Sequence, residues 1–238
     1  MNRVALITGA SRGLGKTLAA FLAVQGYDLI LDARGQGDLD STAAELRGHG
    51  GHVIAVAGDV SEPGHRHTLL AAAEGLGRLD LLVNNASILG PSPLPALAGY
   101  PLETLEQVLA VNTLAPLALI QDALGLLARA SSLVVNITSE AAVGGYPGWG
   151  GYGASKAALD LLSLTLANEL REQRVAVVSV DPGDMRTQMH QDAFPGESID
   201  DRPLPESTLP FWAWLFGQEP MAVSGQRLQA QSDVWAIP

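Results

Sequence analysis

Two side chains four residues apart, Tyr152 and Lys156, have the types and spacing for proton transfer. On a helix this spacing places both side chains on one face. A phenol with an ordinary pKa near ~10 is a poor base at neutral pH, but an adjacent ammonium group stabilises the phenolate and lowers that pKa. The pair therefore predicts an acid/base site, although the same spacing also occurs in surface pairs that have no function.

A hydroxyl and a glycine-rich loop precede this pair. Ser139 lies thirteen residues before Tyr152 and directly follows an apolar segment, 133–138, that we expect to form a buried strand. The glycine-rich segment 140–151 then connects the hydroxyl to the helix that carries Tyr152. This order brings a hydroxyl donor, a tunable phenol and a cation together at a strand end, which suits chemistry at a carbonyl or an alcohol.

A second glycine-rich loop, 8–15, lies near the start of the chain. It follows the continuous apolar run 4–7, which is typical of a strand buried on both faces, and precedes a helix expected over 16–25. Glycines let the backbone approach a pyrophosphate, and the helix N-terminus supplies free N–H groups and a positive dipole end. The loop residues expected to contact a dinucleotide are Gly9, Ser11, Arg12, Gly13, Leu14 and Gly15.

The residues after the second predicted strand, 29–33, bear on the choice between NADP and NAD. An arginine at this position pairs with a 2′-phosphate, whereas an acidic residue binds the ribose 2′-hydroxyl. Arg34 follows the strand directly, and Arg12 is a second cation for the same phosphate, so the sequence favours NADP(H). Strand alternation points Asp32 the same way as Arg34, which keeps NAD(H) open as the alternative.

Further polar residues end the following predicted strands. Asp59 follows the strand 53–57 and suits either an adenine amino group or a cap for the next helix. Asn84 and Asn85 end the strand 79–83 and are expected to fix loop backbone or to flank the ribose. Asn112 falls in the apolar stripe of a helix over 103–129, which Pro116 is expected to kink or loosen. A buried amide needs a partner, so Asn112 either makes a structural hydrogen bond or holds a water beside Lys156.

The remaining pattern alternates strands and helices. We expect strands over 175–180 and 226–230, helices over 38–49, 67–75 and 152–171, and a lid over the substrate pocket at 188–216. The aromatic cluster 211–216 suits a core, an interface or the substrate site. The expected fold is a doubly wound, Rossmann-like parallel sheet of about seven strands in three α/β/α layers, forming one domain over 1–238.

Composition restricts the class of protein. The net charge of −11, from 14 basic and 25 acidic residues, argues against nucleic-acid binding, which needs a basic face. The sequence contains no cysteine, and the five histidines form no convincing metal cluster; His65 and His67 are expected to be solvated. The N-terminus resembles a strand rather than an export signal, and no uninterrupted apolar stretch reaches the ~18–20 residues of a membrane span. A cytoplasmic protein is expected.

These motifs together resemble those of the short-chain dehydrogenase/reductase family, in its compact single-domain branch. The similarity covers nearly the whole chain and rests on T-G-A-S-R-G-L-G (8–15), D-V (59–60), N-N-A (84–86), Asn112, Ser139, Y-G-A-S-K (152–156) and P-G-D-M-R-T (182–187). Two departures are Ser87, where the family usually has glycine, and the C-terminus D-V-W-A-I-P, which lacks the frequent glycine pair.

The resemblance implies a role for each matching residue. Tyr152 would be the acid/base, and Lys156 would lower its pKa and bind the nicotinamide ribose. Ser139 would orient the substrate oxygen, and Asn112 would hold a water in a proton relay. Further cofactor contacts would come from Val60, Asn85, Ala86, Pro182, Gly183, Met185 and Thr187. A homodimer or tetramer through the helices 103–129 and 152–172 is also implied.

The sequence thus predicts an oxidoreductase that transfers a hydride between NADP(H) and a small carbonyl or secondary-alcohol substrate. One alternative is a non-catalytic NADP(H)-binding regulator on the same fold. Others are an NAD-preferring dehydrogenase, or epimerisation or dehydration through a transient keto intermediate. The substrate itself is not encoded in any motif.

Overall fold

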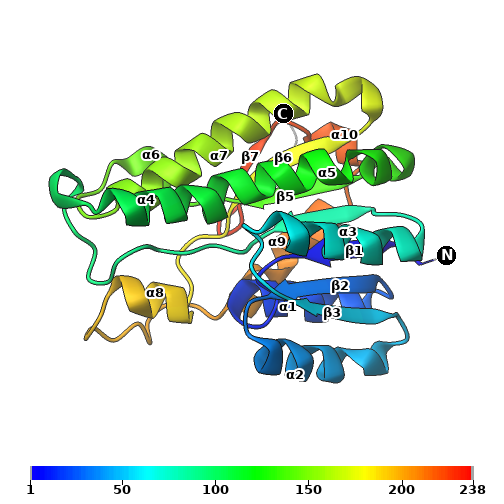
Figure 1. The fold of residues 1–238 in the computed structure, drawn as a ribbon, viewed down its shortest axis with the longest axis horizontal. Helices are drawn as coiled ribbons and strands as arrows, with labels where there is room; N and C mark the ends of the chain where they lie inside the picture. The colour runs from blue at the N-terminus through cyan, green and yellow to red at the C-terminus, as the bar shows by residue number, and fades with distance from the viewer. Residues whose placement is uncertain (1, 237–238) are drawn as a thin grey trace.

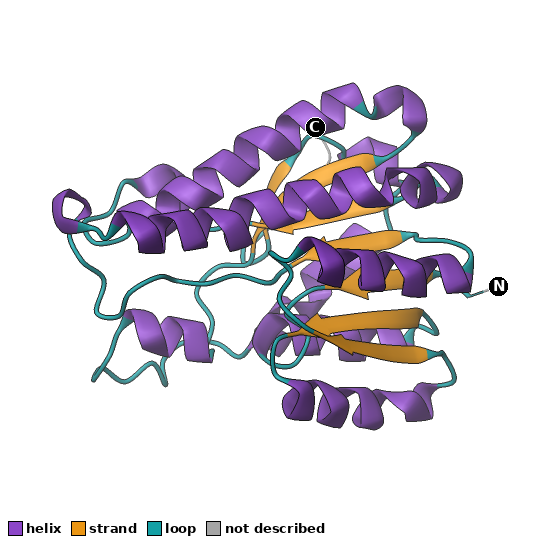
Figure 2. Ribbon diagram, viewed as in Figure 1, coloured by secondary structure: helices purple, strands orange, loops and turns teal. Residues whose placement is uncertain are grey.

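A parallel sheet flanked by helices forms the centre of the computed structural model, which describes residues 2–236 (Figures 1 and 2). The strand order is β3-β2-β1-β4-β5-β6-β7, and all the pairings are parallel. The strands are β1 Val4–Ile7, β2 Asp28–Ala33, β3 Val53–Ala57, β4 Leu81–Asn84, β5 Leu133–Ile137, β6 Ala176–Asp181 and β7 Arg227–Gln229. The order reverses between β1 and β4, which makes their carboxyl ends the switch point where such sheets bind ligands.

Helices cover both faces of the sheet. The longer helices are α1 Gly13–Val24, α2 Gln36–Leu46, α3 Pro63–Leu76, α4 Leu102–Leu109, α5 Ala115–Ala130, α7 Gly150–Glu169 and α9 Leu209–Phe216. Three short helices are α6 Ala141–Gly144, α8 Gln188–Ala193 and α10 Pro220–Val223. Helices α1, α2 and α9 pack on one face of the sheet and form a first hydrophobic core with it. Helices α3, α5 and α7 pack on the other face and form a second core.

The continuous apolar runs explain why the sheet is buried on both faces. Along β2, Leu29 and Leu31 pack into the first core, while Ile30 between them packs into the second. All three side chains are fully buried. Each of these central residues faces one helical layer or the other, which explains why the apolar run 29–31 shows no polar alternation. The expected Rossmann-like fold is therefore confirmed.

The observed bounds differ from the expected ones chiefly at helix starts. Strands β1 and β3 have the expected bounds. Helix α3 begins at Pro63, four residues before the expected start, because proline is well suited to the first turn. Helix α1 begins at Gly13, inside the glycine loop, so that loop's backbone forms the helix N-terminus.

The helical run from Leu102 to Ala130 contains a π-helical turn at Ala110–Leu114, between α4 and α5. Pro116 has no N–H to donate to the Asn112 carbonyl, and the turn loosens there, as expected. The run has a mean hydropathy of 1.4 and passes for a membrane span by length and composition alone. Its apolar face, including Leu119 and Ile120, instead packs on the sheet.

The segment expected to form a lid, 188–216, contains two different structures. Helix α8 and the turn Pro205–Thr208 lie at the cavity described below. Helix α9 belongs to the core: Phe211, Trp212 and Leu215 are fully buried, and Phe216 lies against Phe21 of α1. The aromatic cluster 211–216 therefore belongs to the hydrophobic core, which is one of the three places expected for it from the sequence. It does not line the cavity.

Close backbone packing at the glycine loop leads to a first prediction. A Cβ at Gly15 would overlap the Gly9 carbonyl oxygen and lie 2.6 Å from Asn85 Nδ2. Because the Gly9 atoms are backbone and cannot rotate away, Gly15→Ala should lower the free energy of unfolding by about 1–3 kcal/mol and weaken dinucleotide binding. Urea unfolding measures the first effect, and NADPH titration measures the second.

Gly75→Ala is the matched control, because Gly75 lies in helix α3 and a Cβ there would meet nothing within 4 Å. It should stabilise the protein by about 0.5–1 kcal/mol through helix propensity. A Gly15→Ala protein as stable as the native chain would contradict the packing of this loop.

Candidate active site

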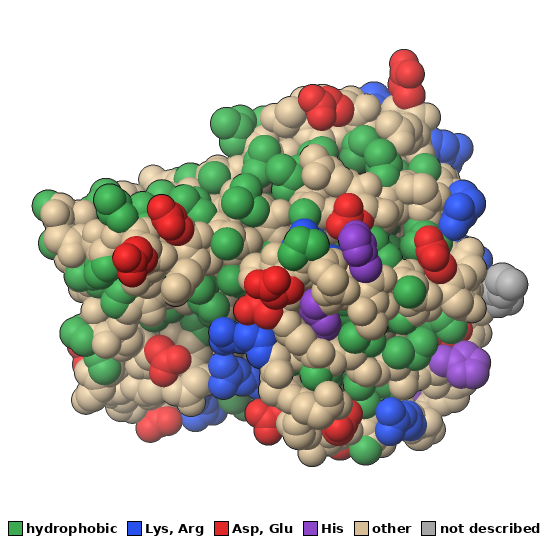
Figure 3. Space-filling model, in the orientation of Figure 1, with side chains coloured by type: hydrophobic (Ala, Val, Ile, Leu, Met, Phe, Trp, Pro, Cys, Tyr) green, Lys and Arg blue, Asp and Glu red, His purple; other side chains and the backbone are tan. Residues whose placement is uncertain are grey.

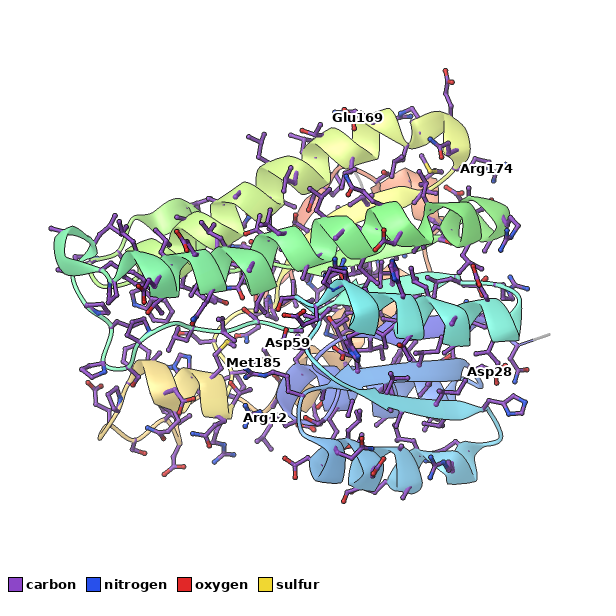
Figure 4. The ribbon with its side chains drawn as sticks, in the orientation of Figure 1. Arg12, Asp28, Asp59, Glu169, Arg174 and Met185 are labelled. Atoms are coloured by element: carbon purple, nitrogen blue, oxygen red, sulfur yellow. The ribbon has the colours of Figure 1, made fainter. Side chains whose placement is uncertain are left out.

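A cavity of about 1420 Å³ opens at the carboxyl ends of the strands. Figure 3 shows lysine and arginine side chains gathered beside the hollow on this face of the molecule. In Figure 4, Arg12, Asp59 and Met185 lie near one another, although they come from three distant parts of the sequence, and all three line the cavity. The cavity therefore joins the glycine loop to the ends of β3 and β6.

Most of the expected site residues line this cavity. They are Gly9, Ser11, Arg12, Gly13, Leu14, Arg34, Asp59, Val60, Asn85, Ala86, Ser139, Tyr152, Lys156, Pro182, Gly183, Met185 and Thr187. Two expected residues do not line it. Gly15 is buried against the Gly9 carbonyl, and Asn112 is fully buried in the π-helical turn.

The glycine loop is fixed by side chains from β1 and β4. Asn85 Nδ2 donates to the carbonyls of Thr8 and Gly9 at 2.9 and 3.1 Å, and Thr8 Oγ1 accepts from the backbone N–H groups of Asn85 and Ala86. Gly9 and Gly13 have φ angles of +66° and +53°, which glycine adopts without strain. A loop held open at a helix N-terminus fits the pyrophosphate of a dinucleotide.

The two arginines and Asp32 have different environments. Arg12 and Arg34 are both exposed at the cavity. Asp32 is only 2% exposed, and its Oδ1 lies 2.6 Å from His65 Nε2. The expectation that His65 is solvated is therefore wrong: its side chain is 9% exposed and paired, whereas His67 is exposed. The alternation of side chains along β2 predicts that Asp32 points the same way as Arg34, but it does not predict the pairing of Asp32 with His65 of α3.

Asp59 fixes the turn after β3. Its Oδ1 accepts from both the backbone N–H and the hydroxyl of Ser61. Glu62, rather than Asp59, is the N-cap residue of α3. Asp59 thus holds the loop at the end of β3 and still lines the cavity beside Val60.

Tyr152 and Lys156 lie on helix α7 with both side chains buried, 8% and 2% exposed. Lys156 Nζ donates to the Ile137 carbonyl at the end of β5, at 2.8 Å, and lies 5.6 Å from the centroid of the Tyr152 ring. Ser139 follows two residues after Ile137. One strand end therefore carries the serine and anchors the lysine that lies under the tyrosine.

Burial dominates the acid/base behaviour of this pair. It raises the pKa of Tyr152 to about 12, against the opposing effect of the nearby hydroxyls of Ser87 and Ser139. Burial also lowers the pKa of Lys156 to about 8. The expected lowering of the Tyr152 pKa by the lysine is thus not found in this structure, because the cost of desolvating the phenolate is larger and the ammonium bonds to a carbonyl instead.

Asn112 is fully used by other protein groups. Its Oδ1 accepts from the Ile88 N–H at 2.9 Å, and its Nδ2 donates to the Ile88 carbonyl and to Ser155 Oγ. The structural alternative for this side chain is therefore the one observed. These bonds connect the π-helical turn, the loop after β4 and helix α7 three residues beyond Tyr152.

In the sequence, Ser87 differs from the family pattern only by replacing the usual glycine. Its hydroxyl is buried near Tyr152, where it opposes the rise in the pKa of that phenol. The position of Ser87 directly after the N-N-A motif is the feature of the sequence that could have indicated its place in the site.

Arg227 was not predicted at all. From β7 it donates to Asp160 at 3.0 Å, to the Ser139 carbonyl at 2.9 Å and to Asp181 at 3.4 Å. The last strand therefore supports the backbone of Ser139. No local pattern indicates this contact, because the four residues are far apart in the sequence.

Apolar side chains surround the reactive end of the cavity. Leu89, Tyr152 and Ala193 form a small buried cluster, against which Leu94, Met189 and Phe194 pack. The Trp149 ring meets the Tyr152 ring edge-on, with centroids 5.9 Å apart. A substrate at the Tyr152 hydroxyl would therefore meet hydrocarbon on this side.

Comparison with known proteins identifies the family. The family model for short chain dehydrogenase matches residues 3–198. A 3-oxoacyl-[acyl-carrier-protein] reductase of Synechocystis is 35% identical over 191 residues, which is 79% of this chain and 76% of that protein.

Two solved structures are also similar. A putative short chain dehydrogenase from Pseudomonas syringae has a TM-score of 0.89 and 33% identity, over 96% of this chain and 94% of that one. Another from Shigella flexneri 2a, complexed with NADP, has a TM-score of 0.89 and 29% identity over 98% of both chains.

The chain belongs to the short-chain dehydrogenase/reductase family. It is an NAD(P)-dependent oxidoreductase, as the resemblance of its motifs indicated.

The buried lysine gives a second prediction. A folded-state pKa of about 8 against an ordinary 10.5 means that charged Lys156 destabilises the fold by about 3 kcal/mol below pH 8. Between these values the unfolded chain binds more protons, so this penalty disappears as the pH rises. Lys156→Met removes the charge but also the charge-assisted bond to Ile137, worth about 1.5–3 kcal/mol. The variant should therefore be at least as stable as the native chain at pH 7, by up to about 1.5 kcal/mol, and this advantage should be lost by pH 10.

Urea unfolding at pH 7 and pH 10 measures this difference. Lys16→Met is the control, because Lys16, the other lysine of the chain, is 38% exposed and bonds to Glu45 on the surface. It should show no gain at pH 7. A Lys156→Met protein less stable than the native chain at pH 7 would contradict the predicted cost of the buried charge.

Proposed function

We propose that this protein transfers a hydride reversibly between NADP(H) and a small, moderately apolar carbonyl or secondary alcohol. One observation carries the proposal: Tyr152, Lys156 and Ser139 meet at one end of a single cavity whose other end is the glycine loop. When bound, the nicotinamide supplies or accepts the hydride. The protein residues bind, orient and handle the proton.

Tyr152 is proposed as the group that exchanges a proton with the substrate oxygen. A pKa of about 12 keeps its phenol protonated at neutral pH, which is the form that donates a proton when a carbonyl is reduced. Ser139, at the same strand end, is proposed to orient the substrate oxygen by a hydrogen bond. This protonation state supports carbonyl reduction as the favoured direction.

Lys156 and Asn112 are proposed to act on the arrangement of the site. The Lys156 ammonium, held by the Ile137 carbonyl, lies beside Tyr152, where the nicotinamide ribose is expected. The Asn112 side chain, bonded to Ile88 and Ser155, fixes the position of helix α7. The proposed water relay through Asn112 would therefore have to use its backbone carbonyl rather than its amide.

The cost of burying Lys156 supports catalysis over the regulatory alternative. A binding protein on this fold needs the glycine loop, but it gains nothing from a lysine whose burial lowers its pKa to about 8. Groups with such perturbed pKa values in a cavity are typical of catalytic sites. We therefore propose an active enzyme rather than a non-catalytic sensor.

NADP(H) is proposed as the preferred cofactor. Arg12 and Arg34 are exposed at the cavity, whereas Asp32 is buried against His65 and is not free for a ribose hydroxyl. The similar Shigella protein complexed with NADP agrees with this preference.

Some expectations stay predictions. The apolar surroundings of Tyr152 support an apolar substrate, and the Synechocystis relative reduces a 3-oxoacyl group by its name, but neither identifies the substrate here. A homo-oligomer is supported by exposed leucines on the expected helices, such as Leu114 and Leu161, at 58% and 67%. The cytoplasmic location and the single-domain organisation with a lid likewise stay predictions.

The acid/base role gives a third prediction. Tyr152→Phe removes the phenolic hydroxyl and should lower kcat/KM for reduction of an apolar ketone by at least about 100-fold, because loss of a general acid has that effect. The dissociation constant for NADPH should change by less than about threefold, since the ring remains. Steady-state kinetics and fluorescence titration measure the two quantities.

Tyr27→Phe is the matched control, because Tyr27 is buried at the opposite edge of the sheet, under Arg3. It should keep normal turnover. If the Tyr152→Phe enzyme kept most of its activity, the assignment of the acid would be wrong.

The arginines give a fourth prediction. Arg34→Ala and Arg12→Ala should each weaken NADPH binding about tenfold, the effect of losing one charge-assisted hydrogen bond to a phosphate, and leave NADH binding unchanged. Parallel fluorescence titrations with the two cofactors measure this.

Arg47→Ala is the control for these titrations, because Arg47 is exposed at the far end of α2 and does not line the cavity. A native protein that prefers NADH would overturn the proposed cofactor preference.

A further inference from the structure

A buried imidazole–carboxylate pair lies at the ribose end of the cavity. Asp32, on β2, is 2% exposed, and the His65 side chain, on α3, is 9% exposed; Oδ1 and Nε2 are 2.6 Å apart. An ionised carboxylate only accepts hydrogen bonds, so the imidazole donates. The backbone carbonyl of Asp32 accepts from the Ala10 N–H of the glycine loop at 2.8 Å. Asp32 is therefore held between the glycine loop and α3.

A third residue makes room for this pair. Gly58 follows β3, and a Cβ there would lie 2.6 Å from two carbons of the His65 ring. The three atoms nearest to that Cβ all belong to His65, and Gly58 has no positive φ angle. The glycine is needed for the ring rather than for the backbone. Three elements, β2, the end of β3 and α3, therefore fit one another through Asp32, Gly58 and His65.

The location of the pair links it to the cofactor. Asp32, Arg34 and Asp59 all line the cavity, at the ends of β2 and β3. A free carboxylate at this place accepts a hydrogen bond from a ribose 2′-hydroxyl and repels a 2′-phosphate. Asp32 places a carboxylate here, but this carboxylate is not free, because its Oδ1 already accepts a hydrogen bond from His65.

We propose that His65 is a specificity-determining residue: it holds Asp32 below the ribose and so lets Arg12 and Arg34 bind the 2′-phosphate of NADP(H). This inference rests on the proposed NADP(H)-dependent function. In this account His65 touches neither substrate nor cofactor, and its effect passes through the Asp32 carboxylate. It is therefore a positioning residue, and its removal should change which cofactor is bound more than how well the loop folds.

The test is a pair of titrations, with NADPH and with NADH, on His65→Ala. They are run at pH 8, because burial raises the pKa of Asp32 and a high pH favours its ionised form. The freed carboxylate should weaken NADPH binding about tenfold, as expected for a nearby like charge, and leave NADH binding unchanged or tighter. Retained NADH binding also shows that the variant is folded.

Two further variants separate charge from packing. In the Asp32→Ala/His65→Ala double variant no carboxylate remains, so the preference for NADPH should return to within about threefold of the native ratio. Gly58→Ala should displace the ring while keeping both Asp32 and His65, and should therefore shift the preference in the same direction as His65→Ala. In the His65→Ala background the added methyl group should have no further effect.

The outcomes distinguish the inference from the function on which it rests. Equal weakening of both cofactors by His65→Ala, or a double variant that does not recover the preference, would show that the pair only braces the glycine loop and would overturn the proposal. The native titration tests the proposed function. If the native protein binds neither cofactor, both proposals fail.

Discussion

The arrangement of the reactive end depends on the buried ammonium of Lys156. A charged group is kept away from water only when other groups compensate it. Here the compensation comes from a hydrogen bond to the Ile137 carbonyl and from the negative charge of Asp160. That bond fixes helix α7 to the end of β5, and it thereby brings Tyr152 to Ser139. Around it, Asn112 ties α7 to the loop after β4, and Arg227 supports the Ser139 backbone. The site is thus held where helix α7 meets the ends of β4, β5 and β7. Burying the ammonium costs stability, and the proposed chemistry explains why that cost is tolerated.

Much of this fold could be predicted from the sequence because the signals are local. Apolar runs without alternation gave the buried strands, and β1 and β3 have the expected bounds. The glycine loop and the Tyr152–Lys156 spacing likewise depend on neighbours in the chain. The pairing of Asp32 with His65 depends on α3 packing beside β2, and the bonds of Arg227 depend on β7 returning beside β6. Such contacts between distant segments leave no periodic pattern.

The pKa of Tyr152 illustrates a different limit of sequence-based prediction. Proximity of an ammonium group was inferred correctly, since Lys156 lies under the ring. Its electrostatic effect was not, because the sequence does not show how deeply both groups are buried. Burial raises the pKa of the phenol and lowers that of the amine, so each group is driven toward its neutral form. The two hydroxyls near Tyr152, on Ser87 and Ser139, are the groups that oppose this effect on the phenol.

The central claim is that this chain delivers a hydride to a carbonyl carbon. The most direct measurement uses NADPH in which both hydrogens at the nicotinamide C4 position are replaced by deuterium, incubated with the protein and a set of apolar ketones. Mass spectrometry then locates any deuterium in the alcohol products. The account predicts one deuterium on the carbinol carbon, in proportion to the NADPH oxidised. Tight NADPH binding without deuterium transfer to any ketone would contradict it and would favour a regulator that only binds the cofactor.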